Sequence, residues 1–507
     1  MKISKRSSGL ILGLIILYNI LIRFQVELYE IGYDSFFVHV LINSISEFGY
    51  AKWCLSTLSF AGLYPYSYAS SVPFLLSGFS QISNIHMNYV IFIYCQIIGL
   101  LSIFVGYLMA SKVTDNDFIK LISALFFSVS LSIVDYSTMT IPTRGLLIVL
   151  APLSYYMLVK IHETSKFSYY VLFVSLSLFL FVTHHLFYFL IPLFLSYVIL
   201  FFLPKFKICK LFPEKYRPLM ILIGFSIMFS IPFFTGKFVE DSRYAPLFTN
   251  YLRYMGIPLI YAIGGLLYLT FKTNKTYSEY LLIMTTVFIT VFIYNLTYLK
   301  MFIPVFLVPF AGYGFYNFVK SVHSSKNAKL FIILSLLVIT SFVSYFQFLH
   351  NNDNNDFIEH NLEQSTFVAG NWMKENTIGN AISNNNHLGF RLAAIAETTH
   401  FLTLSSVMDQ IYGFIIPDIS EFERYPLTSE DFWYSGYSGP DHGNAIWADL
   451  HRLKLSPTNY SINYVVEDVD LDTYVLWNHR PFASKLIVSA HNDKACVFDD
   501  GDIKIWM

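Results

Sequence analysis

Charged residues and cysteines are both scarce in this sequence. Charged side chains make up 13% of the 507 residues, against about a quarter of a typical soluble domain. The formal net charge is −1, so no overall basic field favours a nucleic-acid partner. The four cysteines show no metal-like spacing, which gives no support to a zinc site. Two alternatives stay open for them: unpaired thiols, or a disulfide between Cys54 and Cys496 outside the membrane.

Apolar residues, by contrast, are abundant and gathered into long runs. They form 55% of the chain, with 18% aromatic, and the mean hydropathy is +0.52. The apolar runs lie at 9–26, 88–110, 119–134, 145–160, 169–183, 186–203, 218–235, 255–271, 279–297, 301–319 and 330–349. Since about twenty apolar residues cross a bilayer, they predict an α-helical polytopic membrane domain with about eleven spans. No small-residue cleavage site follows the first run, which predicts an uncleaved first helix.

The basic residues between these runs predict the orientation in the membrane. The basic clusters that share a side with the basic N-terminus are Lys205, Lys207, Lys210, Lys215 and Arg217; Lys272 and Lys275; and Lys320, Lys326 and Lys329. The positive-inside rule makes that side cytoplasmic. The N-terminus is then cytoplasmic, and a long first loop (about 27–87) and everything after residue 350 lie outside.

A change of composition near residue 350 predicts two domains. Residues 1–350 form the multi-span membrane domain, and residues 351–507 form a small extracytoplasmic α/β domain of ordinary size. Its predicted elements are a helix over 357–376 with Phe357, Phe367, Val368 and Trp372 inward, strands at 381–383 and 463–467, a helix over 388–397, and a hairpin over 495–506 that turns at Asp500-Gly501. Residues 415–447 read as an irregular, aromatic covering or binding loop.

Ionisable residues gather on the predicted outer face, at the ends of the apolar runs. These candidates are Asp34 and His39 after the first run, Asp135 and Arg144 in the second outer loop, the turn His184-His185, and the outer cations Arg253 and Lys300. An acid at a membrane boundary is costly, so it is a functional candidate by default. Each also has a purely structural alternative: a helix cap for Asp34, a solvated loop for Asp135, interfacial rings for the histidines, and snorkelling anchors for the cations.

Transfer of a sugar from a polyprenyl-phosphate carrier would use this set of residue types. A carboxylate takes the proton from the attacking hydroxyl or amide. Cations, or a bound Mg²⁺ or Mn²⁺, hold the leaving phosphate. We therefore assign Asp34 and Asp135 as candidate catalytic residues, and Arg144, His184, His185, Arg253 and Lys300 as candidate lipid-phosphate ligands. Asp34, Asp135 and His39 are the candidate metal ligands.

The layout of the outer loops resembles the C-type (GT-C) membrane glycosyltransferase superfamily. The similarity lies in Gly32-Tyr-Asp34 with its phenylalanine pair, in Leu63-Tyr-Pro-Tyr-Ser-Tyr68 followed by Val72-Pro-Phe74, in the second-loop acid, and in the late run Lys300–Gly314. It is strongest to archaeal enzymes related to oligosaccharyltransferase catalytic subunits. The resemblance implies that Asp34 is the base or metal ligand, that Asp135 assists, and that Lys300 contacts phosphate or acceptor where the family more often has arginine.

One departure from that family bears on the acceptor. True oligosaccharyltransferases carry a Trp-Trp-Asp-Tyr-Gly signature, whereas the nearest text here is Phe432-Trp-Tyr-Ser-Gly436, without the aspartate. The sequence therefore favours an inverting transferase that moves a sugar from a polyprenyl (dolichyl) phosphate to a glycan, lipid or protein acceptor. The alternatives are oligosaccharyltransferase-like transfer of a whole glycan to protein, and a non-enzymatic flippase for lipid-linked glycans. The expected partners are the lipid-linked sugar, membrane lipids and a glycan or glycoprotein acceptor, with no nucleic acid.

Overall fold

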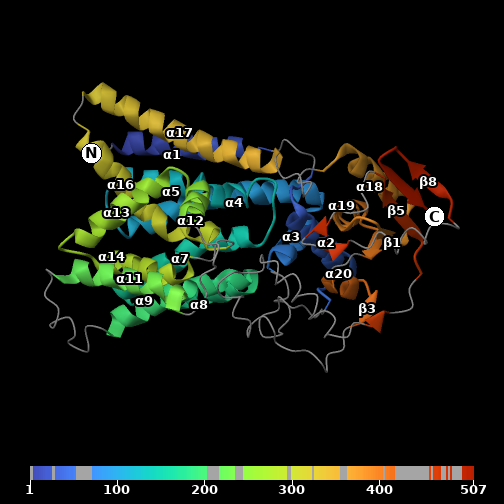
Figure 1. Ribbon diagram of the computed structural model, residues 1–507, viewed down its shortest axis with the longest axis horizontal. Coiled ribbons are helices and arrows are strands. Elements are labelled where there is room, and N and C mark those ends of the chain that lie inside the picture. The colour runs from blue at the N-terminus through green and yellow to red at the C-terminus, as the bar shows by residue number, and fades with distance from the viewer. Residues whose placement is uncertain are drawn as a thin grey trace.

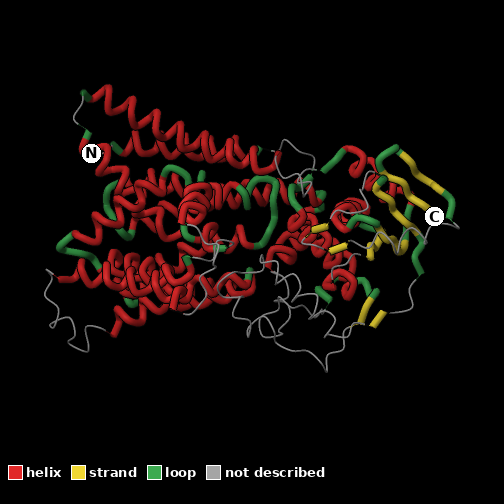
Figure 2. The backbone as a smooth tube through the Cα atoms, viewed as in Figure 1, coloured by secondary structure: helices red, strands yellow, loops and turns green. Residues whose placement is uncertain are grey.

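The structure is a computed structural model. It describes residues 4–24, 29–52, 71–202, 216–234, 244–293, 298–322, 325–353, 362–402, 406–416, 456–457, 461–469, 476–477, 480–481 and 494–507. Helices form one end of the molecule, and the strands gather at the other end beside the C-terminus (Figure 2).

Helices make up most of the described residues up to 353. They are α1 (Lys5–Ile22), α2 (Tyr33–Phe48), α3 (Ser71–Ser83), α4 (Met87–Ser111), α5 (Asp117–Ser128), α6 (Leu131–Val134), α7 (Arg144–Thr164), α8 (Phe167–Thr183), η2 (His185–Leu190), α9 (Ile191–Phe202), α11 (Arg217–Phe234), α12 (Tyr244–Met255), α13 (Pro258–Phe271), α14 (Tyr277–Ile289), η4 (Thr290–Phe292), α15 (Leu299–Phe302), α16 (Pro304–Ser321) and α17 (Lys326–Asp353). Each of the predicted apolar runs overlaps at least one of these helices. The first and last long helices, α1 and α17, run side by side along one edge of the bundle (Figure 1).

Three of the described helices, α1, α4 and α7, are long and apolar enough to cross a membrane. A fourth span results if the bent pair Thr249–Met255 and Pro258–Phe271, which meet at 99°, is counted as one broken span. The chain is therefore a membrane protein by the length and composition of these helices. The other apolar stretches among the described residues, such as Leu330–Phe346 of α17, are 10–17 residues long, so the number of about eleven spans stays a prediction.

Small residues let α13 and α16 approach closely within the bundle. A Cβ atom added to Gly265 would lie 1.9 Å from the backbone oxygen of Phe310, and one added to Gly314 would lie 1.8 Å from that of Tyr261. No side chain fits in such a contact, so both positions require glycine. This packing fixes the start of α16, which is preceded directly by α15 and Lys300.

The rest of the chain forms a small α/β unit. Its elements are α18 (Gln364–Asn376), β1 (Gly379–Ser383), α19 (Asn386–Ala396), β2 (Thr399–Leu402), α20 (Ser406–Ile411), β3 (Ile415–Ile416), β4 (Ser456–Pro457), β5 (Tyr464–Asp468), β6 (Leu476–Trp477), β7 (Arg480–Pro481), β8 (Cys496–Asp499) and β9 (Ile503–Trp506). The main sheet has the order β2-β1-β5-β9-β8. Strands β2, β1 and β5 are parallel, whereas β9 is antiparallel to both β5 and β8. This mixed sheet confirms the predicted strands and the final hairpin, in which Gly501 has a φ of +99°.

One predicted helix face is partly wrong. Phe367 and Trp372 of α18 pack against the core of this unit, as predicted. Val368 is 43% exposed, and its place in the core is taken by Ala369. The helix is rotated slightly from the predicted face because small residues, not branched ones, meet α19. Phe357, and most of the predicted loop 415–447, lie outside the described residues.

Helix α2 lies between the helical bundle and the α/β unit (Figure 1). One face of α2 places Phe36, Phe37 and Val40 in the core of the α/β unit. The opposite face places Val38 and Ile42 in the core of the bundle. Because both faces are buried, the first turn of α2 is fixed where the two parts meet.

The predicted domain boundary near residue 350 stays a prediction, since residues 354–361 lie outside the described ranges.

Candidate functional site

Asp34 lies in the first turn of α2, at the junction just described. The residue before the helix is Gly32, whose φ of +86° is readily adopted only by glycine. Gly32 is the N-cap, and no side chain caps the helix. The structural alternative for Asp34, a capping role, is therefore not what the structure shows. A carboxylate in the first turn is instead stabilised by the helix dipole.

Backbone contacts join the start of α2 to the second outer loop. The amide of Ile31 donates to the carbonyl oxygen of Met139 at 2.7 Å. The amide of Ile141 donates to the hydroxyl of Ser35 at 3.2 Å. The loop that carries Asp135 and ends at Arg144 thus lies directly against the turn that carries Asp34.

Arg144 forms an ion pair with Asp34. Arg144 is the first residue of α7, and its guanidinium donates to a carboxylate oxygen of Asp34. The Arg144 and Asp34 side chains are 19% and 38% exposed, so the pair is open to solvent on one side. The guanidinium also lies 5.1 Å from the ring centroid of Tyr136, which restricts its orientation.

Asp135 follows α6 and is half-buried. Burial raises the pKa of its carboxyl group to about 7, against the opposing effects of Arg253, Arg144 and Lys300. A carboxyl group that titrates near neutrality is suited to exchange protons in a reaction. The three opposing cations are also the outer cations that the sequence singled out.

Lys300 and Arg253 reach Asp135 from two further helices. Lys300 lies in α15, and its ammonium group is 4.8 Å from the ring centroid of Tyr254. Burial lowers the pKa of Lys300, and the neighbouring Arg253 adds to this effect. The hydroxyl of Ser132 ties these segments to α6, at 3.3 Å from the carbonyl oxygen of Tyr254 and 3.5 Å from that of Lys300. Arg253 is exposed near the end of α12.

Five predicted site residues are therefore brought together from four separate segments. We call them the acid–cation cluster: Asp34, Asp135, Arg144, Arg253 and Lys300. Asp34 and Arg144 form an ion pair. Arg253, Arg144 and Lys300 each act to lower the pKa of Asp135, and Asp135 in turn acts to raise the pKa of Lys300. Such a cluster can hold an anionic group beside a carboxylate that accepts a proton.

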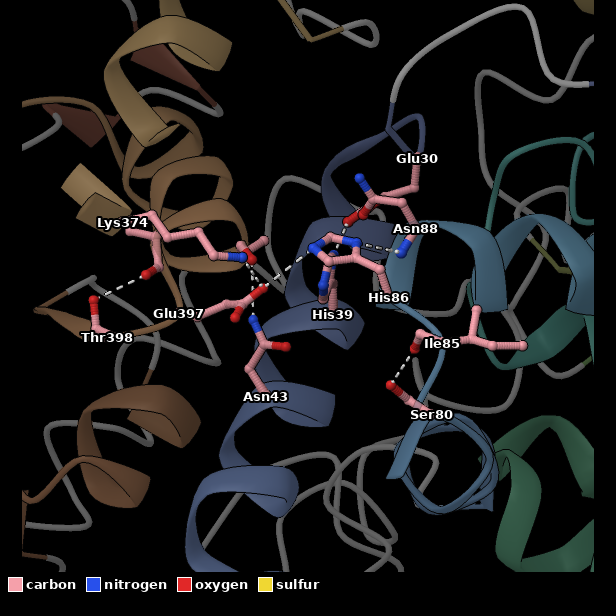
Figure 3. A network of polar contacts seen from close by, with 12 residues as sticks. Glu30, His39, Asn43, Ser80, Ile85, His86, Asn88, Lys374, Glu397 and Thr398 are labelled. Atoms are coloured by element: carbon pink, nitrogen blue, oxygen red, sulfur yellow. Dashed lines mark hydrogen bonds and ion pairs between the residues drawn. The ribbon is translucent and has the colours of Figure 1, made fainter. Parts of the chain in front are cut away.

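His39 lies elsewhere, in a buried pair with Glu30. Its Nδ1 is 2.6 Å from a carboxylate oxygen of Glu30, and the two side chains are 1% and 0% exposed. Figure 3 shows this pair close to His86, whose ring reaches Glu397 of the α/β unit at 3.8 Å. The sequence analysis missed Glu30, although it precedes Asp34 by four residues and satisfies the same rule about acids at a membrane boundary.

The two adjacent histidines follow α8. The Nδ1 of His184 accepts a hydrogen bond from the amide of Leu186 at 3.1 Å, and His184 is the N-cap of η2. The side chain of His185 lies outside the described residues. Their proposed contact with phosphate stays a prediction.

His39 does not join the other two predicted metal ligands, Asp34 and Asp135, because it pairs with Glu30. Among the residues that the structure describes, no group of three or more His, Cys, Asp or Glu side chains could hold a metal ion. His39 faces Glu30, Asp34 accepts from Arg144, and three cations surround Asp135. A cationic surrounding opposes a divalent ion by repulsion. The described residues therefore do not fit the predicted Mg²⁺ or Mn²⁺ site.

Comparisons with known proteins relate this fold to solved structures. No protein-family model and no curated protein sequence matches the chain. The oligosaccharyltransferase of Archaeoglobus fulgidus in complex with Zn and sulfate has a TM-score of 0.57 at 13% identity, over 91% of this chain and 68% of that chain. The same enzyme tethered to an acceptor peptide containing the NVT sequon gives 0.58 at 12%, over 93% and 70%.

A third structure of this archaeal enzyme, in complex with an inhibitory peptide and a dolichol-phosphate, gives a TM-score of 0.56 at 11% identity, over 92% and 70% of the two chains. Identities this low establish a likeness of fold and leave the activity to be argued from the site. The chain therefore shares the fold of this archaeal oligosaccharyltransferase.

Proposed function

We propose that this protein is an inverting glycosyltransferase that moves a sugar from a polyprenyl-phosphate donor to an acceptor at the outer face of the membrane. The observation that carries the proposal is the acid–cation cluster. Its two acids and three cations come from α2, the second outer loop, α12 and α15, and they are linked by the Asp34–Arg144 ion pair and by electrostatic effects around Asp135. The shared fold with an oligosaccharyltransferase supports the same reaction class.

In this reaction the acceptor hydroxyl attacks the anomeric carbon of the donor sugar. The new carbon–oxygen bond forms as the bond from that carbon to the phosphate oxygen breaks, which inverts the configuration. The hydroxyl proton passes to a carboxylate, and the phosphate leaves with the bonding electron pair. Arg144, Arg253 and Lys300 stabilise the negative charge that collects on the leaving phosphate.

The two acids have different proposed roles. Asp34 is the base, because its carboxylate is partly exposed at a fixed helix start and an acceptor can reach it. Its partner Arg144 holds the carboxylate in one orientation. Asp135 sets the charge of the cluster, since its pKa of about 7 makes its ionisation depend on pH near neutrality.

The proposed topology follows from the basic clusters of the sequence. The N-terminus is cytoplasmic, and residues 351–507 form an extracytoplasmic domain above the site. The contact of α2 with the core of the α/β unit supports this arrangement, because it places that unit directly beside the acid–cation cluster. An acceptor would then approach from the outer side.

A second candidate is transfer of a whole lipid-linked glycan to protein. The fold likeness favours it, since the archaeal structures were solved with an acceptor peptide and with a dolichol-phosphate. The missing aspartate in Phe432–Gly436 weighs against it. The two candidates differ in donor and acceptor, not in the proposed base.

The test is a transfer assay with purified protein in lipid nanodiscs. Polyprenyl-phosphate monosaccharides and lipid-linked oligosaccharides are offered with glycan, lipid and sequon-peptide acceptors, and the anomeric configuration of the product is determined. We expect transfer of a single sugar with inversion. Retention of configuration would contradict the proposal, and transfer of a whole glycan to peptide would favour the second candidate.

A further inference from the structure

Arg23 is the largest fully buried polar side chain of the described residues. It is the C-cap of α1 and is 0% exposed. Its Nε donates to the hydroxyl of Ser137 at 2.8 Å. Its two terminal nitrogens donate to the side-chain oxygen of Asn19 at 2.6 Å and to the backbone oxygen of Ser128 at 2.9 Å.

The partners of Arg23 are all neutral oxygens. A buried charge is costly unless hydrogen bonds and opposite charge compensate it. Here the compensation comes from helix ends, because Arg23 caps α1 and the oxygen of Ser128 ends α5. The C-termini of both helices carry partial negative charge and free carbonyl groups. The cation is thus held without a carboxylate among the described residues.

Helix α4 is shaped to accommodate Arg23. A Cβ atom added to Gly99 would lie 2.5 Å from both Cδ and Nε of Arg23. The side-chain amide of Gln96 donates to the backbone oxygen of Arg23 at 2.7 Å. Both the side chain and the backbone of Arg23 are therefore fixed by α4.

The contact with Ser137 leads directly to the acid–cation cluster. The hydroxyl of Ser137 accepts from Arg23 and donates to the backbone oxygen of Ile133. These two residues flank Asp135 on either side. The backbone oxygen of Asp135 accepts from the hydroxyl of Thr140 at 2.7 Å, and the thiol of Cys95 donates to the backbone oxygen of Thr140 at 3.4 Å.

We propose that Arg23 is a positioning residue that holds the turn 133–137, and with it Asp135, in the arrangement needed for transfer. The inference rests on the proposed function for the role of Asp135. Arg23 itself is enclosed and does not touch the substrate. It acts through Ser137, and α4 supports the same loop through Cys95.

The alternative is that Arg23 only caps the C-terminal ends of α1 and α5 through its hydrogen bonds. Three variants separate the two roles. Arg23→Met removes the cation and its hydrogen bonds, whereas Ser137→Ala removes the link from Arg23 to the loop, together with the bond from Ser137 to Ile133, and leaves Arg23 on both helix ends. Ile15→Ala is the control, because it opens a cavity in the core shared by α1 and α5 without touching the loop.

The first readout does not depend on activity. The thiol of Cys95 is fully buried against Thr140, so its alkylation, followed by mass spectrometry, reports on the loop. We expect faster alkylation in Arg23→Met and Ser137→Ala than in wild type and Ile15→Ala. Equal rates in folded samples of all four proteins would overturn the proposal.

The second readout is the rate and its dependence on pH. Misplacement of a reacting group costs about 100-fold in rate, so we expect kcat per folded molecule to fall by about that factor in both variants. Because burial raises the pKa of Asp135, a loosened loop should also move the neutral limb of the pH–rate profile to lower pH. A kcat and profile that match Ile15→Ala would contradict a positioning role. If wild type transfers no sugar, the proposed function fails, and the Cys95 rates alone decide whether Arg23 fixes the loop.

Discussion

Two acidic sites lie within four residues of each other, and they differ in what surrounds them. Asp34 is 38% exposed and pairs with Arg144, the first residue of α7. Glu30 is 0% exposed and meets only His39 among the described contacts of its carboxylate. The first site is open on one side and positively charged, whereas the second is closed. Only the first has room and charge for an anionic substrate.

This difference shows what the general rule about acids at a membrane boundary leaves out. The rule selects Glu30 and Asp34 equally. Exposure and the sign of the neighbouring charge then separate a reactive site from a structural pair. Substitutions in the acid–cation cluster should therefore lower the rate of transfer, whereas substitutions in the Glu30–His39 pair should lower the stability of the fold.

The largest expected effect belongs to Asp34→Asn. Loss of a general base lowers kcat by about 10²–10⁴-fold, and we expect that loss with insertion and yield unchanged. Asp117→Asn is the matched control, because Asp117 also lies in a first turn and pairs with Lys120 at 3.0 Å, with exposures of 41% and 14%. Single-turnover transfer measures both. Normal turnover by Asp34→Asn would contradict the proposal that Asp34 is the base.

The next effect is expected from Lys300→Met. Removing one group that stabilises developing charge costs about 10²-fold in kcat. Lys112→Met is a close control, since Lys112 lies 5.3 Å from the ring centroid of Tyr156 and pairs with Glu163 at 2.7 Å. Steady-state rates with increasing donor concentration distinguish a loss of kcat from a loss of binding. Equal effects of the two substitutions would show that Lys300 is an interface anchor.

Asp135 should link pH to both rate and stability. Its pKa of about 7 in the folded protein lies above the value of about 4 expected when unfolded. Folding therefore becomes less favourable as pH rises from about 4 through 7, because the unfolded state releases this proton first. We expect Asp135→Asn to melt higher than wild type at pH 8, with a smaller difference at pH 5.

The wild-type rate should rise as pH drops through about 7, because protonation of Asp135 removes a negative charge beside the cations that hold the leaving phosphate. The Asp135→Asn variant should lack this pH dependence. Thermal melts and pH–rate profiles of both proteins test this. An Asp135→Asn variant that melts at a lower temperature than wild type at pH 8 would contradict a raised pKa of Asp135, because the ionised carboxylate would then stabilise the folded state.

The smallest effect on the reaction is expected at the Glu30–His39 pair. His39→Leu leaves a buried carboxylate without its partner and should cost about 3–5 kcal/mol of stability. Replacing both residues with leucine should recover much of that loss. Transfer per folded molecule should change by no more than about twofold in either variant. A large loss of kcat in the stable double variant would place this pair in the reaction.

The sequence predicts much of the architecture because apolar runs and strand patterns are local. The final hairpin follows from Asp500-Gly501, and β5 follows from its buried valines. The rotation of α18 could not be predicted, since it depends on which residues of α19 it meets. The double burial of α2 was equally hidden, because it requires two cores that are distant in sequence.

The sequence predicts candidate site residues where a charged side chain lies at the end of an apolar run. Asp34, Arg144 and Lys300 were each predicted separately as site residues, and only the fold brings them into one cluster. Glu30 and Arg23 were missed for the same physical reason. Their roles depend on complete burial and on partners from other segments, which no single run of residues reveals. His39 was predicted as a metal candidate without reference to Glu30, the residue with which it pairs in the structure.

Photocrosslinking of a polyprenyl-phosphate analogue tests the central claim most directly, because it does not require the sugar or the acceptor to be known. The analogue carries a diazirine beside the phosphate, and labelled peptides are identified by mass spectrometry in wild type and Lys300→Met. The account predicts labelling of peptides that contain Arg144, Arg253 or Lys300, weakened in the variant and by excess unlabelled polyprenyl phosphate. Labelling confined to other segments, unaffected by Lys300→Met, would contradict it.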